Sequence, residues 1–452
     1  VMLELGRLWF WIFFSKVLSQ ELKSLINFNI VGNENENLFL SANDNGQFNE
    51  IGNQINIQNF YVSKNKKYES YSSISLGSNS NILSLNFKIN SKFGSIHLGK
   101  ILPQTNKNSF KTEMIFSKNA EGIPGISYYS KPIQFKNNTL LFEIYQGKFQ
   151  SQDNYSDAPF LHYKSLELQN QNNLFMISFK LQHAVQFGGE TFYGKSIPVT
   201  PKIFFDVLTG GGGNKSQTVI DQGYKVGNGL GSYTFLLRNT NSKINYSIYY
   251  EHYFDDLSGM KLKNLGDGVF GLMLEKNNNF FQYEYIDTTN QSGNQHPPGV
   301  DSYYWHQTYR FGWTNKGESL GNIFISPLNN RKKIYHLSMK YHFKHFDMSI
   351  QCAKEKNYIP YNFKNNNKPI ANSNSMIDSN VFSGIILSKK ISSNIISLGY
   401  YFDNKNKSIS NIILSYRIQL WKVILQLKIL LTMKYISILM VLCLKEMKPK
   451  FQ

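Results

Sequence analysis

Long stretches of this chain alternate between apolar and polar residues. Between 335 and 343, every second residue is apolar: Tyr335, Leu337, Met339, Tyr341 and Phe343. Successive side chains of a β-strand point to opposite faces, so the alternation predicts strands with one apolar and one polar face. Similar segments lie near 54–99, 138–149, 160–169, 174–184, 233–253, 268–276, 280–289, 334–343, 346–355, 381–391, 394–403 and 409–419.

These strands favour a membrane-spanning fold. Their polar face carries too much charge for the inside of a sandwich, and their apolar face is too aromatic to be left in water. Strands of about ten residues cross a bilayer when tilted. We predict an all-β fold: a transmembrane antiparallel β-barrel of about 16–18 strands with long loops and short helical plug or periplasmic elements. A soluble β-solenoid or propeller is the alternative, but the chain shows no fixed repeat period.

The rest of the chain organises around this barrel. Residues 1–19 predict a signal peptide, because Arg7 precedes an apolar run that is too short to span a bilayer as a helix; a buried helix is the alternative. The barrel is expected over 20–420, with loop insertions near 186–230 and 290–330. Within the first insertion, 201–208 predicts a short helix. Residues 421–452 form an atypical apolar and basic tail of open role, such as an extra or interfacial helix.

Composition changes this picture little. The 34 Phe and 28 Tyr suit aromatic girdles at the two bilayer interfaces. The formal charge of +18 fits a nucleic acid, an anionic membrane or an anionic polymer. Scattered lysines disfavour nucleic acid, and a genome biased toward Asn and Lys explains the excess equally well. Cys352 and Cys443 form neither a metal spacing nor a disulfide framework.

The sequence carries no recognisable catalytic motif. Nucleophile-elbow, zinc-protease, Walker and dinucleotide patterns do not occur. Ser338 and His336 share one strand face, which supports a surface hydrolase only weakly. We therefore predict no enzyme activity, no cofactor and no metal site. The polar side of the strand near 335–344 has no evident carboxylate partner and predicts a basic, hydrated lumen face, formed by His336, Lys340, His342 and Lys344.

A dense aromatic and polar cluster lies in the second insertion. Flat aromatic rings cover the apolar faces of sugars, while Arg, Lys and His bind hydroxyl and carboxylate groups. The cluster predicts a polysaccharide-binding site at Tyr303, Tyr304, Trp305, His306, Arg310, Trp313 and Lys316. An interfacial girdle combined with a plug loop is the alternative.

Several ordered motifs resemble those of one protein family. They are 123–126 (Ile-Pro-Gly-Ile), 160–165 (Phe-Leu-His-Tyr-Lys-Ser), 183–189 (His-Ala-Val-Gln-Phe-Gly-Gly), 283–285, 298–299, 303–306, 312–314 and 320–322. From about 35 to 420 the chain resembles the Wzi family of capsule-assembly proteins, in its Bacteroidetes-like branch. No single motif is decisive; their order and spacing carry the resemblance.

The resemblance implies an outer-membrane barrel with periplasmic helical elements and a lectin-like role. Such a protein would tie capsular or exported polysaccharide to the cell surface, and an anionic polymer would suit the basic charge. The expected partners are this polysaccharide and outer-membrane lipid, without nucleic acid, and we expect a monomeric barrel. A porin or export channel is the alternative. The resemblance supplies no catalytic residue, and it gives no counterpart for the tail.

Overall fold

The fold is described from a computed structural model. It describes residues 21–31, 38–41, 53–63, 66–76, 81–103, 112–150, 157–191, 194–210, 220–221, 225–239, 244–255, 257–291, 302–306, 308–309, 311–359, 364–365, 368–369, 376–404 and 409–421. The predicted signal peptide and residues 422–452 of the predicted tail lie outside these ranges.

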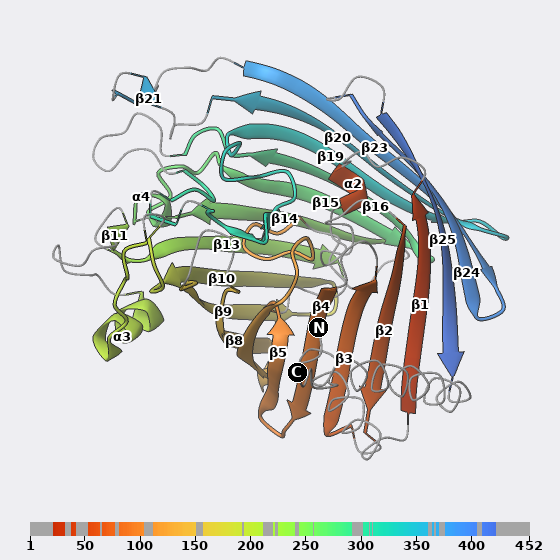
Figure 1. Cartoon of the computed structure of the whole chain (residues 1–452), viewed down its shortest axis with the longest axis horizontal. Coiled ribbons are helices and arrows are strands. Elements are labelled where there is room, and N and C mark those ends of the chain that lie inside the picture. Colours follow the sequence, from red (N-terminus) through yellow and green to blue (C-terminus); the bar gives the residue numbers. More distant parts are fainter. Residues whose placement is uncertain are drawn as a thin grey trace, which may run out of the picture.

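Eighteen antiparallel strands close into one barrel (Figure 1). Each barrel strand pairs with the barrel strand that follows it in the sequence, and β1 (Glu21–Val31) pairs with β25 (Ile409–Trp421) to close the ring. The other members are β2 (Gln54–Val62), β3 (Tyr68–Leu76), β4 (Asn81–Asn90), β5 (Gly94–Ile101), β6 (Ile123–Ser130), β8 (Asn138–Lys148), β9 (Phe160–Gln171), β10 (Phe175–Phe187), β13 (Asn228–Asn239), β14 (Asn245–Phe254), β15 (Gly268–Lys276), β16 (Asn279–Asp287), β19 (Lys332–His342), β20 (Asp347–Tyr358), β23 (Met376–Ile391) and β24 (Asn394–Asp403). The predicted antiparallel barrel of about 16–18 strands is confirmed.

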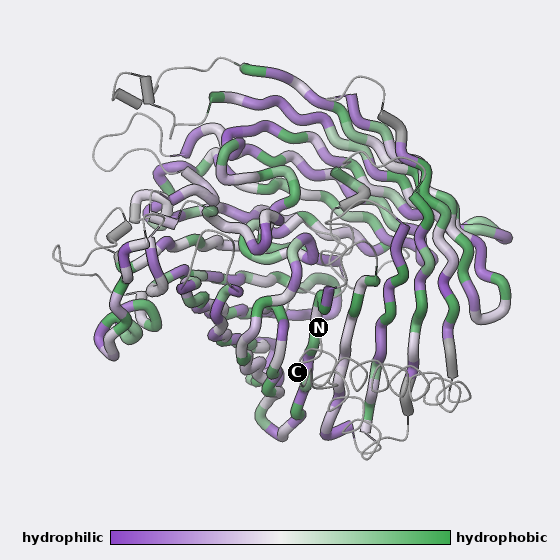
Figure 2. The backbone as a smooth tube through the Cα atoms, in the orientation of Figure 1, coloured by the Kyte–Doolittle hydropathy of each residue, from purple (hydrophilic) through white to green (hydrophobic). Residues whose placement is uncertain are grey.

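Burial along the strands is the reverse of that in a soluble protein. On β1, Ile30 is 56% exposed whereas its neighbour Asn29 is 6% exposed. On β14, Ile248 is 52% exposed while Ser247 and Glu251 are buried. Figure 2 shows the alternation of hydrophobic and hydrophilic positions along the strands. Apolar side chains therefore face outward, where lipid would cover them, and polar side chains face the lumen.

The two ends of the barrel differ in their connections. At one end, connections of two to seven residues join successive barrel strands, and β1 begins and β25 ends there. The turn between β15 and β16 shows why they can be so short: Asn277 and Asn278 both have positive φ, 48° and 66°, as a type I′ turn requires. The opposite end carries the long connections, including 102–122, 188–227, 255–267 and 288–331. Outer-membrane barrels place their short turns in the periplasm, so the long connections face the cell exterior.

Two of the long connections fold back into the ring of strands. Figure 1 shows the orange segment before β6 and the teal segment between β16 and β19 inside the barrel. Their apolar residues join inward side chains of the wall in one buried cluster, which includes Met114, Phe116, Trp313, Leu320 and Phe324. We call residues 112–122 and 302–331 the plug.

Short helices and hairpins complete the fold. Helix α2 (Leu38–Ser41) contacts β23 and β24 and places Phe39 against Phe324 of the plug. Helix α3 (Pro201–Thr209) confirms the helix predicted at 201–208: the Thr200 side chain caps its first turn, and Gly210 ends it with φ 71°. Helix α4 (Leu257–Met260) lies in the connection before β15. All three lie in long connections, rather than at the short-turn end where the resemblance implied helices.

The remaining elements are short strands. These are β7 (Ile133–Phe135), which extends the hairpin with β8, and the two-residue strands β11 (Ile220–Asp221), β12 (Lys225–Val226), β17 (Thr314–Asn315), β18 (Glu318–Ser319), β21 (Lys364–Asn365) and β22 (Lys368–Pro369). No helix of the described ranges is long and apolar enough to cross a bilayer.

The closed barrel predicts a heat-modifiable protein. Backbone hydrogen bonds around the whole ring should resist dodecyl sulfate until the sample is boiled. The protein is extracted from the cell envelope with detergent and run on a gel. The unboiled sample should migrate as a compact species and the boiled sample as an extended one. Recovery of a monomer that stays dispersed without detergent would contradict the membrane barrel.

Candidate functional site

The predicted aromatic cluster forms the centre of the plug. Tyr303, Tyr304 and Trp313 are 0%, 3% and 1% exposed. Trp313 Nε1 donates to the carbonyl oxygen of Ile115 at 2.7 Å, and the Tyr304 hydroxyl donates to that of Met114. These rings therefore hold the two plug segments together. The expectation that they stack directly on sugars is corrected: they are enclosed, and no ring face is left for a ligand.

The local backbone explains how Tyr304 and Trp313 meet. Gly312 has φ 62°, and a Cβ atom there would lie 1.9 Å from the carbonyl oxygen of Tyr304. Only glycine fits this position. The turn it allows brings the Trp313 amide to the Tyr304 carbonyl at 2.9 Å.

His306 is also enclosed. It is 7% exposed, and its Nδ1 accepts hydrogen bonds from the backbone amides of Thr308 and Tyr309 at 3.2 and 3.4 Å. Burial lowers the pKa of His306 to about 4. The imidazole is therefore neutral at pH 7 and serves the backbone of the plug.

The other members of the cluster differ in position. Trp305 is half-buried, and the Lys316 side chain is 34% exposed. Lys316 forms a salt bridge with Glu121 at 3.0 Å, and it shares this carboxylate with Lys100 of β5. Arg310 lies outside the described residues and stays a prediction.

Glu121 connects the plug to the barrel wall. Its side chain is 1% exposed, and besides Lys316 it pairs with Lys100 of β5, which is also largely buried. The backbone joins the same segments: Ser117 donates to the Leu320 carbonyl at 2.8 Å, and Asn315 Nδ2 donates to the Glu121 carbonyl at 3.2 Å. One carboxylate therefore ties both plug segments to the wall at the extracellular end.

A second buried carboxylate, Glu284 of β16, anchors the plug deeper in the lumen. It accepts from the backbone amide of Thr112 at 2.8 Å, from the Tyr249 hydroxyl at 2.5 Å, and pairs with His336 Nδ1 at 2.9 Å. Tyr249 reaches this position because it lies across Gly271, where a Cβ atom would be 2.0 Å from its ring.

The four residues of the predicted basic lumen face do not act together. His336 is buried against Glu284, which corrects the expectation that it has no carboxylate partner. His342 pairs with Asp347 in the next strand, and Lys344 is exposed in the short turn after β19. Lys340 is half-buried. Within the described ranges, no three His, Cys, Asp or Glu side chains gather as metal ligands would.

Sequence reasoning missed the plug's first segment. Residues 112–122 carry Glu121, Met114 and Phe116, and the structure pairs them with residues about 200 positions later. A local signal was present, because the apolar run Met114–Ile115–Phe116 stands in a connection between strands.

Comparison with known proteins agrees with this architecture. The sequence profile of a family described as capsule assembly protein Wzi matches residues 108–350. Comparison with curated sequences gives no match. Among solved structures, the chain is similar to Wzi of Escherichia coli, an outer-membrane carbohydrate-binding β-barrel involved in group 1 capsule assembly, at 13% identity and a TM-score of 0.58, over 90% of this chain and 85% of that one. Lower similarity, with a TM-score of 0.46 and 10% identity each, is found to OccK5 (OpdH) of Pseudomonas aeruginosa, over 89% of this chain and 97% of that one, and to OccAB2 of Acinetobacter baumannii, over 89% and 98%.

The buried Glu121 predicts a variant with a loosened plug. Changing Glu121→Gln leaves the Lys100 ammonium group buried without its counter-charge, which costs about 3 kcal/mol or more. We expect frequent opening events in planar-bilayer conductance, where the unaltered protein conducts little. Glu69→Gln is the control, because the Glu69–Lys88 pair is partly exposed and worth less than about 1 kcal/mol. Equal conductance in the E121Q variant and the parent would show that this carboxylate does not hold the plug.

The pKa of His306 predicts an acid-sensitive plug segment. Its pKa is about 4 in the folded state, below the ordinary value of 6.5. The unfolded segment therefore binds the proton more tightly, and local stability falls as the pH drops from about 6.5 toward 4. The protection factors of amides 303–306, 308 and 309, which correct the exchange rates for slower intrinsic exchange at low pH, should fall over that range, and fall less in His306→Gln. His345→Gln, in an exposed turn, is the control. Protection factors that do not change with pH would contradict this assignment.

Proposed function

The chain belongs to the Wzi family of capsule-assembly proteins, and from that premise we propose that it binds capsular or other exported polysaccharide and anchors it at the outer surface of the outer membrane. The proposed role is that of a lectin, without catalysis. We place the chain in the Bacteroidetes-like branch of the family on its ordered motifs. We expect the barrel to work as a monomer.

The observation that carries the proposal is the filled lumen. An open channel needs a continuous water path, whereas here a buried apolar cluster reaches from β5 and β6 across the plug to β23 and β24. The plug is also tied to the wall by two buried carboxylates, Glu121 and Glu284. Such an interior suits a surface-binding protein better than the alternative of a diffusion porin.

We propose that polysaccharide meets the extracellular end at the outer surface of the plug. Trp305, Arg310 and Lys316 are the contact candidates, since the other members of the predicted cluster support them from within. Trp305 offers the half-buried aromatic face, and Arg310 and Lys316 supply positive charge that favours acidic sugars by charge-assisted hydrogen bonds. A single weak site is sufficient for a repeating polymer, because repeated engagement raises the effective affinity.

The proposal predicts that Trp305→Ala releases polysaccharide from cells. Loss of one aromatic–sugar contact should weaken each engagement about fivefold, and the ratio of cell-bound to released polysaccharide should fall. Tyr341→Ala is the control, since this exposed ring lies near the short-turn end. Both variants should insert normally, as judged by heat-modifiable migration. Normal retention by W305A cells would exclude this contact. Steady, large conductance of the unaltered protein combined with no polysaccharide binding would favour the channel instead.

A further inference from the structure

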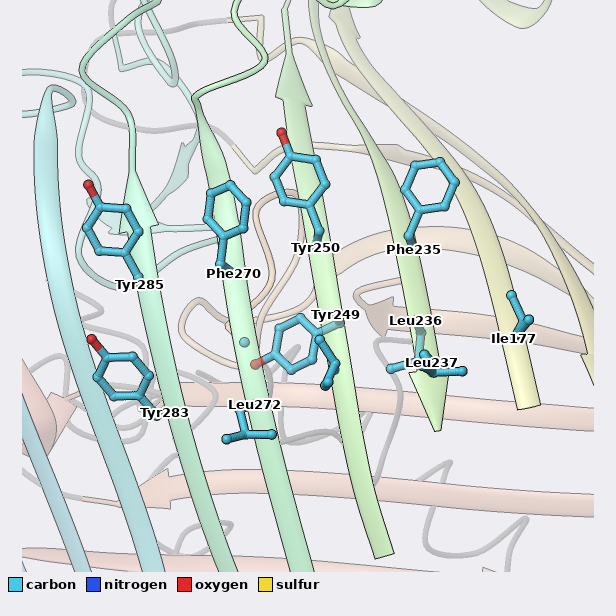
Figure 3. Close-up of a pocket in the computed structure, with 12 residues that line it drawn as sticks. Ile177, Phe235, Leu236, Leu237, Tyr249, Tyr250, Phe270, Leu272, Tyr283 and Tyr285 are labelled. Carbon is cyan, nitrogen blue, oxygen red and sulfur yellow. The ribbon is translucent and has the colours of Figure 1, made fainter. Parts of the chain in front are cut away.

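A row of aromatic rings crosses the outer face of the barrel near its extracellular end. The strand register places Phe235, Tyr250, Phe270 and Tyr285 directly beside one another on β13 to β16 (Figure 3). The Tyr250 and Phe270 ring centres are 4.5 Å apart. Figure 3 shows the hydroxyl groups of Tyr250 and Tyr285 pointing toward the connections at the strand ends. The row therefore marks the depth at which the bilayer changes from hydrocarbon to headgroups.

Below this row the wall forms an apolar groove. Two residues further along each strand lies a second outward row, formed by Leu237, Ile248, Leu272 and Tyr283. The two rows line a shallow groove of about 590 Å³. Its lining is almost wholly apolar, and Phe235 and Ile248 are 53% and 52% exposed. A hydrocarbon chain fits such a surface.

The connection 255–267 lies over the outside of the barrel, directly above the groove. The Tyr250 hydroxyl donates to the carbonyl oxygen of Leu265 at 2.6 Å, and that of Tyr233 donates to Met260 at 3.4 Å. His252, on the outward side of β14, donates through Nε2 to the Gly259 carbonyl at 3.0 Å and is 1% exposed. These contacts fix the outer side of the connection against the lipid-facing wall, while Asn264 and Asp267 on its inner side hydrogen-bond to Tyr303 of the plug.

The exposed side of this connection is both apolar and cationic. Leu262 and Leu265 are 47% and 55% exposed, and they alternate with the exposed Lys261 and Lys263. Within the described part of the chain, neither lysine forms a salt bridge. Leucines that border a lipid-facing groove gain by contact with hydrocarbon, whereas lysines at this level are placed for the phosphates of lipid headgroups.

We propose that the groove and connection 255–267 form a binding site for a phosphorylated lipid of the outer leaflet. One acyl chain occupies the groove between the two rows, and the phosphate pairs with Lys261 and Lys263. The complementary charge selects a phosphorylated lipid over a neutral one. This site faces the lipid, on the opposite side of the barrel wall from the lumen, and it is a different surface from the one proposed for polysaccharide.

The test measures lipid binding to the purified, folded barrel in a neutral detergent by native mass spectrometry. The probe is diphosphoryl lipid A, compared with its dephosphorylated form and with inorganic phosphate as competitor. In the Lys261→Gln/Lys263→Gln variant, we expect affinity for the phosphorylated lipid to fall about 25-fold. The dephosphorylated lipid should bind both proteins equally weakly, and inorganic phosphate should not compete.

Two further variants keep the test specific. Lys389→Gln/Lys390→Gln removes two exposed lysines near the short-turn end and should bind like the parent. Leu272→Trp fills the groove on the lipid side and should weaken binding while both lysines remain. Heat-modifiable migration shows that each variant is folded. Three results would overturn the headgroup assignment: unchanged affinity in K261Q/K263Q, an equal loss of affinity in the K389Q/K390Q control, or equal affinity of the parent protein for the phosphorylated and dephosphorylated lipids. Unchanged affinity in L272W would overturn the groove.

Discussion

A closed ring of backbone hydrogen bonds is the constraint on which this structure depends. In a bilayer, no water is present to satisfy the amide and carbonyl groups of a free strand edge, so a spanning sheet must pair its last strand with its first. Here β1 and β25 meet in continuous register from Lys23 opposite Trp421 to Val31 opposite Ile413. Closure also decides the side-chain pattern, because every strand then has one face toward lipid and one toward the lumen.

Closure has a second consequence, because a ring of eighteen strands encloses a lumen. Such a lumen is either occupied by protein or filled with water. This chain fills it with its own long connections. The plug buries apolar residues such as Trp313 and Phe324, and two buried carboxylates are paired, Glu121 with Lys100 and Glu284 with His336. Buried pairs of this kind fix position more than they add stability, because their desolvation offsets much of their attraction. The result is a barrel whose lumen is crossed by its own connections toward the extracellular end.

The sequence predicts the wall much better than the interior. Strands such as β15 and β19 alternate cleanly, and the two-residue period reports directly on a wall with two different faces. β6 escaped prediction because Pro124 and Gly125 at its start are typical of a turn, and β1 because it directly follows the predicted signal peptide. The plug cannot be found this way, because Trp313 and Ile115 are brought together only by the fold. In a sequence, aromatic residues such as these suit either a sugar-binding site or a buried core. Only the burial of their side chains in the folded protein distinguishes the two.

The central claim is that a plugged barrel binds polysaccharide at its outer surface. The most direct test is calorimetric titration of the polysaccharide purified from the producing cells into the purified barrel, at low and at high salt. The account predicts saturable binding that weakens as salt rises, since exposed charge pairs are screened beyond about 8 Å at physiological ionic strength. A barrel that is folded by its gel migration and yet shows no saturable binding at low salt would contradict it.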